Sequence, residues 1–216
     1  MRELPILFSA PMVRAILEGR KTVTRRVVKP TFQSIEERDD GKPWPWREDL
    51  DRAQDYWYPC PYGEVGDRLW VREAWRAPAG LDDRSGKQIA EACIGAGYRS
   101  PWCPIQYEAD GELNNAKDWR EFGSKPGEAT PGRYRHARFM PRWASRITLQ
   151  VTGVRVERLQ DISEPQARAE GFGDTVDRAH YWFTHLWDGL AKPGTSWANN
   201  PWVWVIEFQR ASGGER

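Results

Sequence analysis

Several short segments of the chain alternate apolar and polar residues with the period of two that is typical of a β-strand. The clearest is residues 147–158, Ile-Thr-Leu-Gln-Val-Thr-Gly-Val-Arg-Val-Glu-Arg, in which Gly153 indicates a possible β-bulge. Further strands are expected at residues 5–9, 21–28, 68–75, 105–109 and 201–210. The last of these is partly apolar on both faces, which predicts a central place in a sheet or barrel.

Two segments have a pattern typical of helices. The first follows Ser9 or Ala10, carries Pro11 in its first turn, where a missing N–H is tolerated, and ends at Gly19. The second, residues 178–190, is rich in aromatic side chains that we expect to pack in the core.

A third, shorter helix is predicted by a capping box, with Ser163 as N-cap and Gln166 at the third helical position. It ends before Gly171 and leaves Glu170 in its last turn. A carboxylate there faces the negative end of the helix dipole, which costs about 0.3–1 kcal/mol. Helix stability therefore does not account for Glu170, and two interpretations stay open: a functional acid, or a solvent-exposed glutamate.

The remaining segments contain Gly, Pro and charge without a clear period. We interpret residues 1–216 as a single domain with inserted loops at about 30–66, 76–104 and 110–132. Short helices and the lack of a βαβ rhythm predict a mainly β chain of the α+β type, namely a small, mostly antiparallel barrel decorated by long loops.

Composition narrows the class of protein. Hydrophobic residues make up 39% and charged residues 29% of the 216 positions, as in globular proteins. No run reaches the length of a membrane span and no signal-peptide pattern is found, so we expect no membrane partner and a cytoplasmic location. The net charge is only +1, so any binding of nucleic acid has to come from local basic patches.

Cysteine and histidine do not indicate a metal site. The three cysteines, Cys60, Cys93 and Cys103, have irregular spacing, which argues against a disulfide framework and matches no zinc motif. We therefore predict no metal and no cofactor.

The most unusual stretch is Gly-Arg-Lys-Thr-Val-Thr-Arg-Arg at residues 19–26. It belongs to a segment with six cations and a single acid, Glu18, and it places the hydroxyl of Thr24 three residues from the amine of Lys21. Such a stretch can bind an anion or take part in acyl chemistry. The alternative is that cations simply favour the end of the preceding helix and the edge of a strand.

A second basic stretch, residues 133–146, contains five arginines interleaved with aromatic residues and no acid. This composition suits stacking on bases and contact with phosphates, although a solvated surface loop is the open alternative. The residues that we expect to contact a nucleoside or nucleic acid are Arg20, Arg25, Arg26, Trp70, Arg72, Tyr107, Arg138, Arg142 and Trp143.

The stretch at residues 19–26 resembles the signature Gly-x-Lys-x-x-Glu-x-Arg of the ASCH domain family, whose fold is a β-barrel related to the PUA RNA-binding domain. Thr24 stands where that signature has Glu. Other segments are similar to long, prophage-type members of the family: Pro-Ile-Leu-Phe-Ser, Gly-Asp-Arg-Leu-Trp-Val-Arg-Glu, Met-Pro-Arg-Trp-Ala-Ser-Arg and Asn-Pro-Trp-Val-Trp-Val. The resemblance implies a PUA-like barrel across nearly the whole chain.

One branch of that family hydrolyses N4-acetylcytidine to cytidine and carries Lys and Thr at these spacings, with a Glu in the helix before the final strand. The resemblance therefore implies an amidohydrolase with Lys21, Thr24 and Glu170 as catalytic residues and a modified cytidine nucleoside or RNA as partner. Thr24 would attack the acyl carbonyl, Lys21 would take its proton, and Glu170 would orient the lysine or protonate the leaving amine.

This scheme places a requirement on Lys21, because a free lysine with a pKa near 10.4 is a poor base at neutral pH. Nearby arginines and burial would lower that pKa. An ionised Glu170 in contact would hold the proton on the lysine, so the scheme needs its carboxyl neutral or held beyond contact distance.

Two other functions stay open. A non-catalytic module could bind RNA or another nucleic acid through the two basic stretches. A metal-dependent nuclease would need acids such as Glu73, Glu108 and Asp110 to meet in space.

Overall fold

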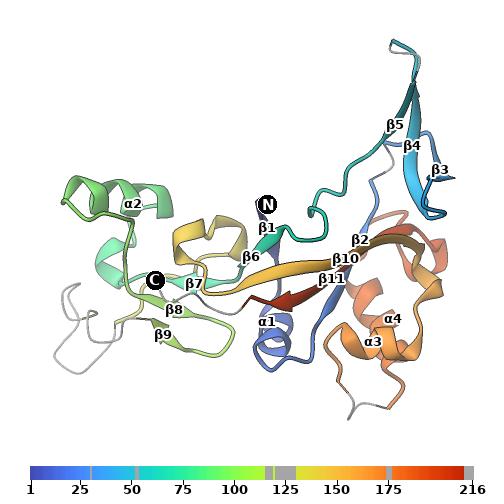
Figure 1. Cartoon of the computed structure of the whole chain (residues 1–216). Coiled ribbons are helices and arrows are strands. Elements are labelled where there is room, and N and C mark those ends of the chain that lie inside the picture. Colours follow the sequence, from blue (N-terminus) through green and yellow to red (C-terminus); the bar gives the residue numbers. More distant parts are fainter. Residues whose placement is uncertain (30, 52–53, 115–118, 120–129, 174–176, 212–216) are drawn as a thin grey trace. The chain divides into compact units, whose positions relative to one another are not determined.

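The computed structural model describes residues 1–29, 31–51, 54–114, 119, 130–173 and 177–211 (Figure 1). The backbone divides into two compact units. Among the described residues, the first contains 1–4, 15–68 and 149–211, and the second contains 5–14 and 69–148. The prediction of a single domain is not tested by this division and stays a prediction.

In the first unit, the long strand β11 (Trp202–Arg210) pairs in antiparallel fashion with β10 (Thr148–Arg158) on one side and β2 (Val23–Val27) on the other. The register of β10 shifts between Val151 and Gly153, so the predicted bulge is confirmed. The central place of β11 is confirmed as well, because both of its edges are paired.

One face of β2 and β11 is covered by α3 (Glu164–Ala169) and α4 (Ala179–Leu190), which lie beside these strands (Figure 1). The cluster that joins them consists of Val23, Leu159, Ile162, Ala167, Ala179, Phe183, Val203 and Val205. The capping box of α3 forms as predicted, with the Ser163 side chain accepting from the Gln166 N–H and the Gln166 side chain accepting from the Ser163 N–H. The short 3-10 helices here are η5 (Leu159–Asp161) and η6 (Trp197–Asn199).

A small antiparallel sheet in the first unit was not predicted. It consists of β3 (Ser34–Glu37), β4 (Pro43–Asp49) and β5 (Gln54–Trp57), all within the expected insertion at 30–66. Trp44 of β4 packs edge-on against Trp204 of β11, with 4.9 Å between ring centroids. This contact lies on the face of β11 opposite Val203 and Val205.

The second unit holds β6 (Arg68–Arg72) and a sheet of β7 (Trp75–Arg76), β8 (Ile105–Tyr107) and β9 (Leu113–Asn114). Its helices are α2 (Gly86–Gly95), which begins with a second capping box, and the 3-10 helices η1 (Ala79–Leu81), η3 (Ala137–Phe139) and η4 (Arg142–Ala144). A hydrophobic cluster in this unit consists of Trp75, Ala77, Ile89, Cys103, Ile105, Tyr107, Met140 and Ala144. The remaining elements are β1 (Glu3–Leu7) and α1 (Ala10–Leu17), which follows β1 as predicted.

The prediction of a mainly β chain with short helices is therefore confirmed. The closed barrel is not found: the described strands form open sheets, with the orders β10-β11-β2 and β3-β4-β5 in the first unit and β7-β8-β9 in the second. The physical reason lies in the strand pairing of the first unit: β10 and β2 lie on either side of β11, and among the described residues they do not pair with each other.

Candidate functional site

The first unit contains a buried ion pair between two residues singled out in the sequence. The Lys21 amine lies 2.6 Å from Glu170 Oε2 and donates to the backbone carbonyl of Glu170 at 2.8 Å. The Lys21 side chain is fully buried and that of Glu170 is only 5% exposed. Lysine and glutamate are rarely buried to this extent unless they are paired.

The backbone fixes the pair in place. Gly19 ends α1 with φ of 75°, a conformation that glycine adopts readily, and the Lys21 N–H then donates to the Ala15 carbonyl at 3.0 Å. Lys21 and Glu170 form an isolated antiparallel bridge, and the Thr22 N–H donates to the Ala169 carbonyl at 2.9 Å. The start of β2 is therefore held directly against the end of α3.

Gly171 permits this close approach. Its φ of 119° lies in the region that other residues avoid, and a Cβ there would come within 3.1 Å of the Ala15 side chain and 3.4 Å of the Lys21 Cβ. A larger residue at this position would push α3 away from Lys21.

A second cation, Arg25, completes the cluster. Its side chain is fully buried, and its two terminal nitrogens lie 3.2 Å from Glu170 Oε1 and 3.4 Å from Glu157 Oε2. It also donates to Gln166 Oε1 at 3.2 Å, while its Nε has no hydrogen-bond partner in the described part of the chain. The cluster thus sets two cations against two carboxylates, and Glu170 lies between Lys21 and Arg25.

Burial lowers the pKa of the Lys21 amine below its ordinary value, because a charged ammonium loses its hydration there. Contact with Glu170 acts in the opposite direction, and the charges of Arg26 and Arg25 lower the pKa further. The contact with Glu170 that the sequence-based scheme sought to avoid is therefore present, and desolvation outweighs it.

Thr24 lies on the other face of β2 from Arg25, because successive residues of a strand point to opposite sides. It is fully buried, and its hydroxyl accepts a hydrogen bond from Arg26 Nη1 at 2.8 Å. Arg26 therefore links the two groups: it binds the hydroxyl of Thr24, and its charge contributes to the lowered pKa of Lys21. The structure brings Lys21, Glu170 and Arg25 into direct contact, whereas Thr24 lies on the other face of β2 and is bonded to Arg26.

Arg20 was expected to contact substrate. It is partly exposed, pairs with Glu18 and donates to the Gly171 carbonyl. A cavity of about 340 Å³ next to it is lined by Glu18, Gly19, Arg20, Thr22, Pro165, Arg168, Ala169 and Gly173. This cavity adjoins the backbone on both sides of the Lys21–Glu170 bridge.

The other predicted contact residues lie in the second unit. Arg72 stacks over Trp70 with 5.3 Å from its guanidinium carbon to the ring centroid and donates to the Met140 carbonyl at 3.2 Å. Tyr107 is buried and donates to the Ala144 carbonyl at 3.1 Å.

The remaining three belong to the basic stretch at 133–146. Trp143 is anchored through a 3.3 Å hydrogen bond from its ring N–H to the Gly86 carbonyl. Arg142 is half-buried and donates to the Thr148 hydroxyl at 3.4 Å, whereas Arg138 is exposed and stacks over Phe139. Of this set, Arg138 is the residue most open to an external partner.

The acids considered for a nuclease are bonded to arginines. Arg146 binds Glu73 through two 2.9 Å hydrogen bonds and also pairs with Asp110 at 2.9 Å. Glu108 pairs with Arg76. Among the described residues, no group of three His, Cys, Asp or Glu side chains is arranged to hold a metal ion. The arrangement is that of structural ion pairs.

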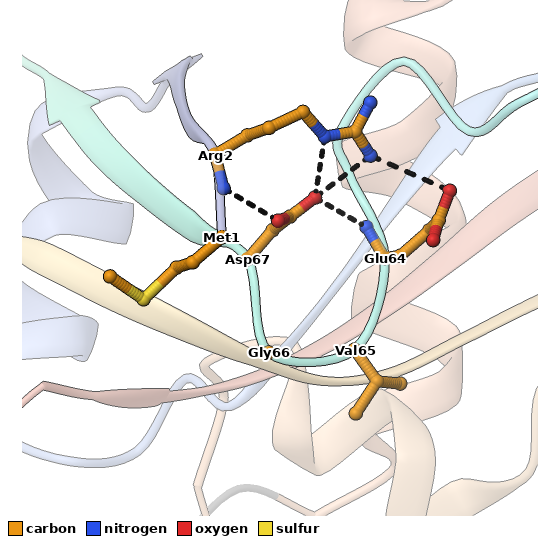
Figure 2. A pocket seen from close by; sticks show the side chains of 6 residues that line it. All are labelled: Met1, Arg2, Glu64, Val65, Gly66 and Asp67. Atoms are coloured by element: carbon orange, nitrogen blue, oxygen red, sulfur yellow. Dashed lines mark hydrogen bonds and ion pairs between the residues drawn. The ribbon is translucent and has the colours of Figure 1, made fainter.

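A hollow of about 480 Å³ near Asp67 contains a similar structural contact (Figure 2). The Asp67 carboxylate accepts hydrogen bonds from the Arg2 N–H at 2.7 Å, from the Arg2 guanidinium and from the Glu64 N–H at 3.1 Å, as Figure 2 shows. These bonds lower the pKa of Asp67 to about 2. Asp67 therefore stays ionised at neutral pH and fastens the turn before β6 to the first residues of the chain.

None of the helices that the structure describes has the length and apolar content needed to cross a membrane.

Cys60, Cys93 and Cys103 are free thiols, and burial raises the pKa of Cys60 to about 11 and that of Cys103 to about 12.

Comparison with known proteins does not show a family for the chain. No family model matches it, and no curated protein matches it either. It is similar to the crystal structure of protein EF3133 from Enterococcus faecalis V583, of the family model DUF984, at 10% identity and a TM-score of 0.39. That alignment covers 100% of this chain and 86% of the other. A likeness at this level carries no argument about function.

Two members of the buried cluster were not identified from the sequence. Glu157 and Gln166 both contact Arg25, yet Glu157 looked like one polar position in an alternating strand and Gln166 like a capping residue only. Gln166 does both, since its side-chain oxygen accepts from the Ser163 N–H and from Arg25. A buried arginine needs anionic partners, so knowing that Arg25 is buried would have pointed to Glu157 and Gln166. The sequence does not show that Arg25 is buried; only the fold does.

Proposed function

We propose that the chain is an amidohydrolase that removes an acyl group from the exocyclic amine of an N4-acylated cytidine, as a member of the ASCH family would. The observation that carries this proposal is the Lys21 amine, which is fully buried and has a lowered pKa although it touches a carboxylate. A lysine whose pKa is reduced in this way can act as a base.

The reaction divides into two steps. The Thr24 oxygen attacks the acyl carbonyl carbon and its proton passes to the Lys21 amine. This step requires the Thr24 hydroxyl, which lies on the other face of β2 from Arg25, to come within hydrogen-bond distance of Lys21 when the substrate binds. Arg26, already bonded to that hydroxyl at 2.8 Å, stabilises the negative charge that develops on the carbonyl oxygen. The C–N bond then breaks, and the cytidine amine leaves with the proton from the Lys21 ammonium. Water hydrolyses the acyl ester on Thr24 and releases the carboxylic acid.

Arg25 explains how Lys21 can lose its proton next to a carboxylate. Once Lys21 is neutral, Glu170 still has a cationic partner 3.2 Å away, so no unpaired charge is left in the protein interior. Glu170 orients the amine through its 2.6 Å hydrogen bond, and Arg25 balances the charge of Glu170.

The direct test is to incubate the purified chain with N4-acetylcytidine at neutral pH and to follow the release of cytidine by chromatography. We expect catalytic release, with acetate formed in equal amount. N4-acetylcytidine that stays intact with an excess of folded protein would contradict the proposal.

A second candidate, a non-catalytic nucleic-acid-binding module, is favoured by one observation in the second unit. Around Arg138, the side chains of Tyr134 and Phe139 are 52% and 66% exposed, so a basic segment presents aromatic rings to solvent. This function predicts RNA affinity that falls steeply as salt rises. Catalytic release of cytidine would distinguish the first candidate from this one.

A further inference from the structure

The first unit contains an aromatic hollow of about 290 Å³ that the proposed reaction has not used. Its walls include the rings of Phe32, Tyr58, Tyr62 and Trp204, together with Val27 and three prolines, and Lys29 lines it as well. This volume is at the small end of the range for ligand pockets, which suits a single base with its sugar rather than a polymer.

Two of the four aromatic walls, Tyr58 and Trp204, are held in place by the surrounding chain. The Tyr58 hydroxyl donates to the Thr31 carbonyl at 2.7 Å, and the Tyr58 carbonyl accepts from the ring N–H of Trp44 at 2.8 Å. Trp44 in turn packs edge-on against Trp204. Fixed rings such as these bind a flat heterocycle by stacking with little loss of side-chain entropy.

Lys29 is the charged residue of the lining. It is exposed, and its ammonium has no ion-pair partner within the residues that the structure describes. A ligand with an aromatic ring and a negative group would match this combination of rings and one cation, and a nucleotide has both.

One lining residue of the hollow, Trp204, shares a sheet face with Thr24. In the register of β11 and β2, Trp204 is directly opposite Arg26 and Ile206 is directly opposite Thr24. Directly opposed residues point to the same face, so Trp204 stands on the face of the sheet that carries Thr24. Two residues along β11, about 7 Å of backbone, separate Trp204 from Ile206, which is the partner of Thr24.

We propose that this hollow binds the base of a cytidine nucleotide by stacking and that Lys29 binds its phosphate. The inference rests on the proposed function for the identity of the base and adds the part of the chain that recognises it. Most of the walls come from residues 31–62, so the segment interpreted from the sequence as an inserted loop provides the recognition surface.

The experiment is isothermal titration calorimetry with cytidine 5′-monophosphate and with cytidine. The intact chain is expected to bind the monophosphate at one saturable site. Phe32→Ala and Tyr62→Ala should each weaken both ligands by roughly tenfold or more, the scale of one lost stacking contact, whereas Tyr62→Phe should not. Lys29→Ala should weaken only the monophosphate. Tyr181→Ala and Lys42→Ala are matched controls at exposed positions outside the hollow and should bind both ligands normally.

Calorimetry measures binding without turnover, so nucleotide binding in the hollow and hydrolysis of N4-acetylcytidine are tested separately. Monophosphate binding that depends on Phe32 and Tyr62, without hydrolysis of N4-acetylcytidine, would support the hollow and contradict the proposed function. Hydrolysis with a KM unchanged in Phe32→Ala and Tyr62→Ala would support the function and overturn the hollow. The proposed nucleotide site would also be overturned if the intact chain bound neither cytidine 5′-monophosphate nor cytidine.

Discussion

Thr24→Val is expected to abolish the release of cytidine from N4-acetylcytidine while leaving the protein folded. Valine has nearly the shape of threonine but no oxygen to attack the acyl carbon, so the covalent step cannot begin. The cost to stability is expected to be modest, because the Arg26 nitrogen that donates to the hydroxyl at 2.8 Å also donates to the Arg25 carbonyl at 3.0 Å and so keeps a partner. The measurement is the rate of cytidine release together with the far-ultraviolet circular dichroism spectrum of each variant.

Two companion variants sharpen this result. Thr22→Val changes an exposed threonine two residues away and should keep the full rate, while Thr24→Ser retains a hydroxyl and should keep part of it. If Thr24→Val releases cytidine as fast as the unaltered chain, Thr24 is not the nucleophile. Under the nucleic-acid-binding alternative, Thr24→Val should leave RNA affinity unchanged.

Lys21→Met is the second variant with a large expected effect. Methionine fills much of the volume of the lysine stem but cannot take a proton, and loss of a general base lowers a rate by roughly 10²–10⁴-fold. Glu170 keeps its partner Arg25, 3.2 Å away, so the variant does not strand a buried carboxylate. In the unaltered chain the neutral amine is the active form, so the rate should fall as the pH drops below the lowered pKa of Lys21.

The control for this variant is Lys42→Met, which removes an exposed lysine whose ammonium lies 3.9 Å from Asp40. It should leave the rate and its pH dependence unchanged. A folded Lys21→Met chain with the full rate, and with the pH dependence of the unaltered chain, would show that Lys21 is only a structural ion-pair partner.

Local signals in the sequence predicted the elements that frame the site. The capping box at Ser163 predicted the start of α3, Gly171 its end, and Gly19 the end of α1; Lys21 and Glu170 meet beside these two helix ends. Each of these features depends on a few neighbouring residues and their backbone preferences. The bulge at Gly153 could be predicted from the sequence for this reason too.

What the sequence could not predict depends on contacts between distant segments. β3, β4 and β5 lack a clear alternation because Pro43 and Pro45 lie in the middle strand and its neighbours are largely exposed. Arg25 looked like a surface cation, and only the packing of α3 and α4 over β2 shows that it is buried against Glu170. The open main sheet was likewise not predictable, because the partners of β11 come from residues 23–27 and 148–158, far apart in the sequence.

The central claim is that burial and Arg25 leave the Lys21 amine easier to deprotonate than an ordinary lysine. The most direct measurement is a titration of the lysine side chains by NMR, with 13C at the ε carbon and the Lys21→Met variant to assign the signal. The account predicts that Lys21 titrates at a lower pH than the exposed lysines and that Arg25→Met moves its titration upward. A Lys21 signal that titrates together with the exposed lysines, or above them, would contradict it.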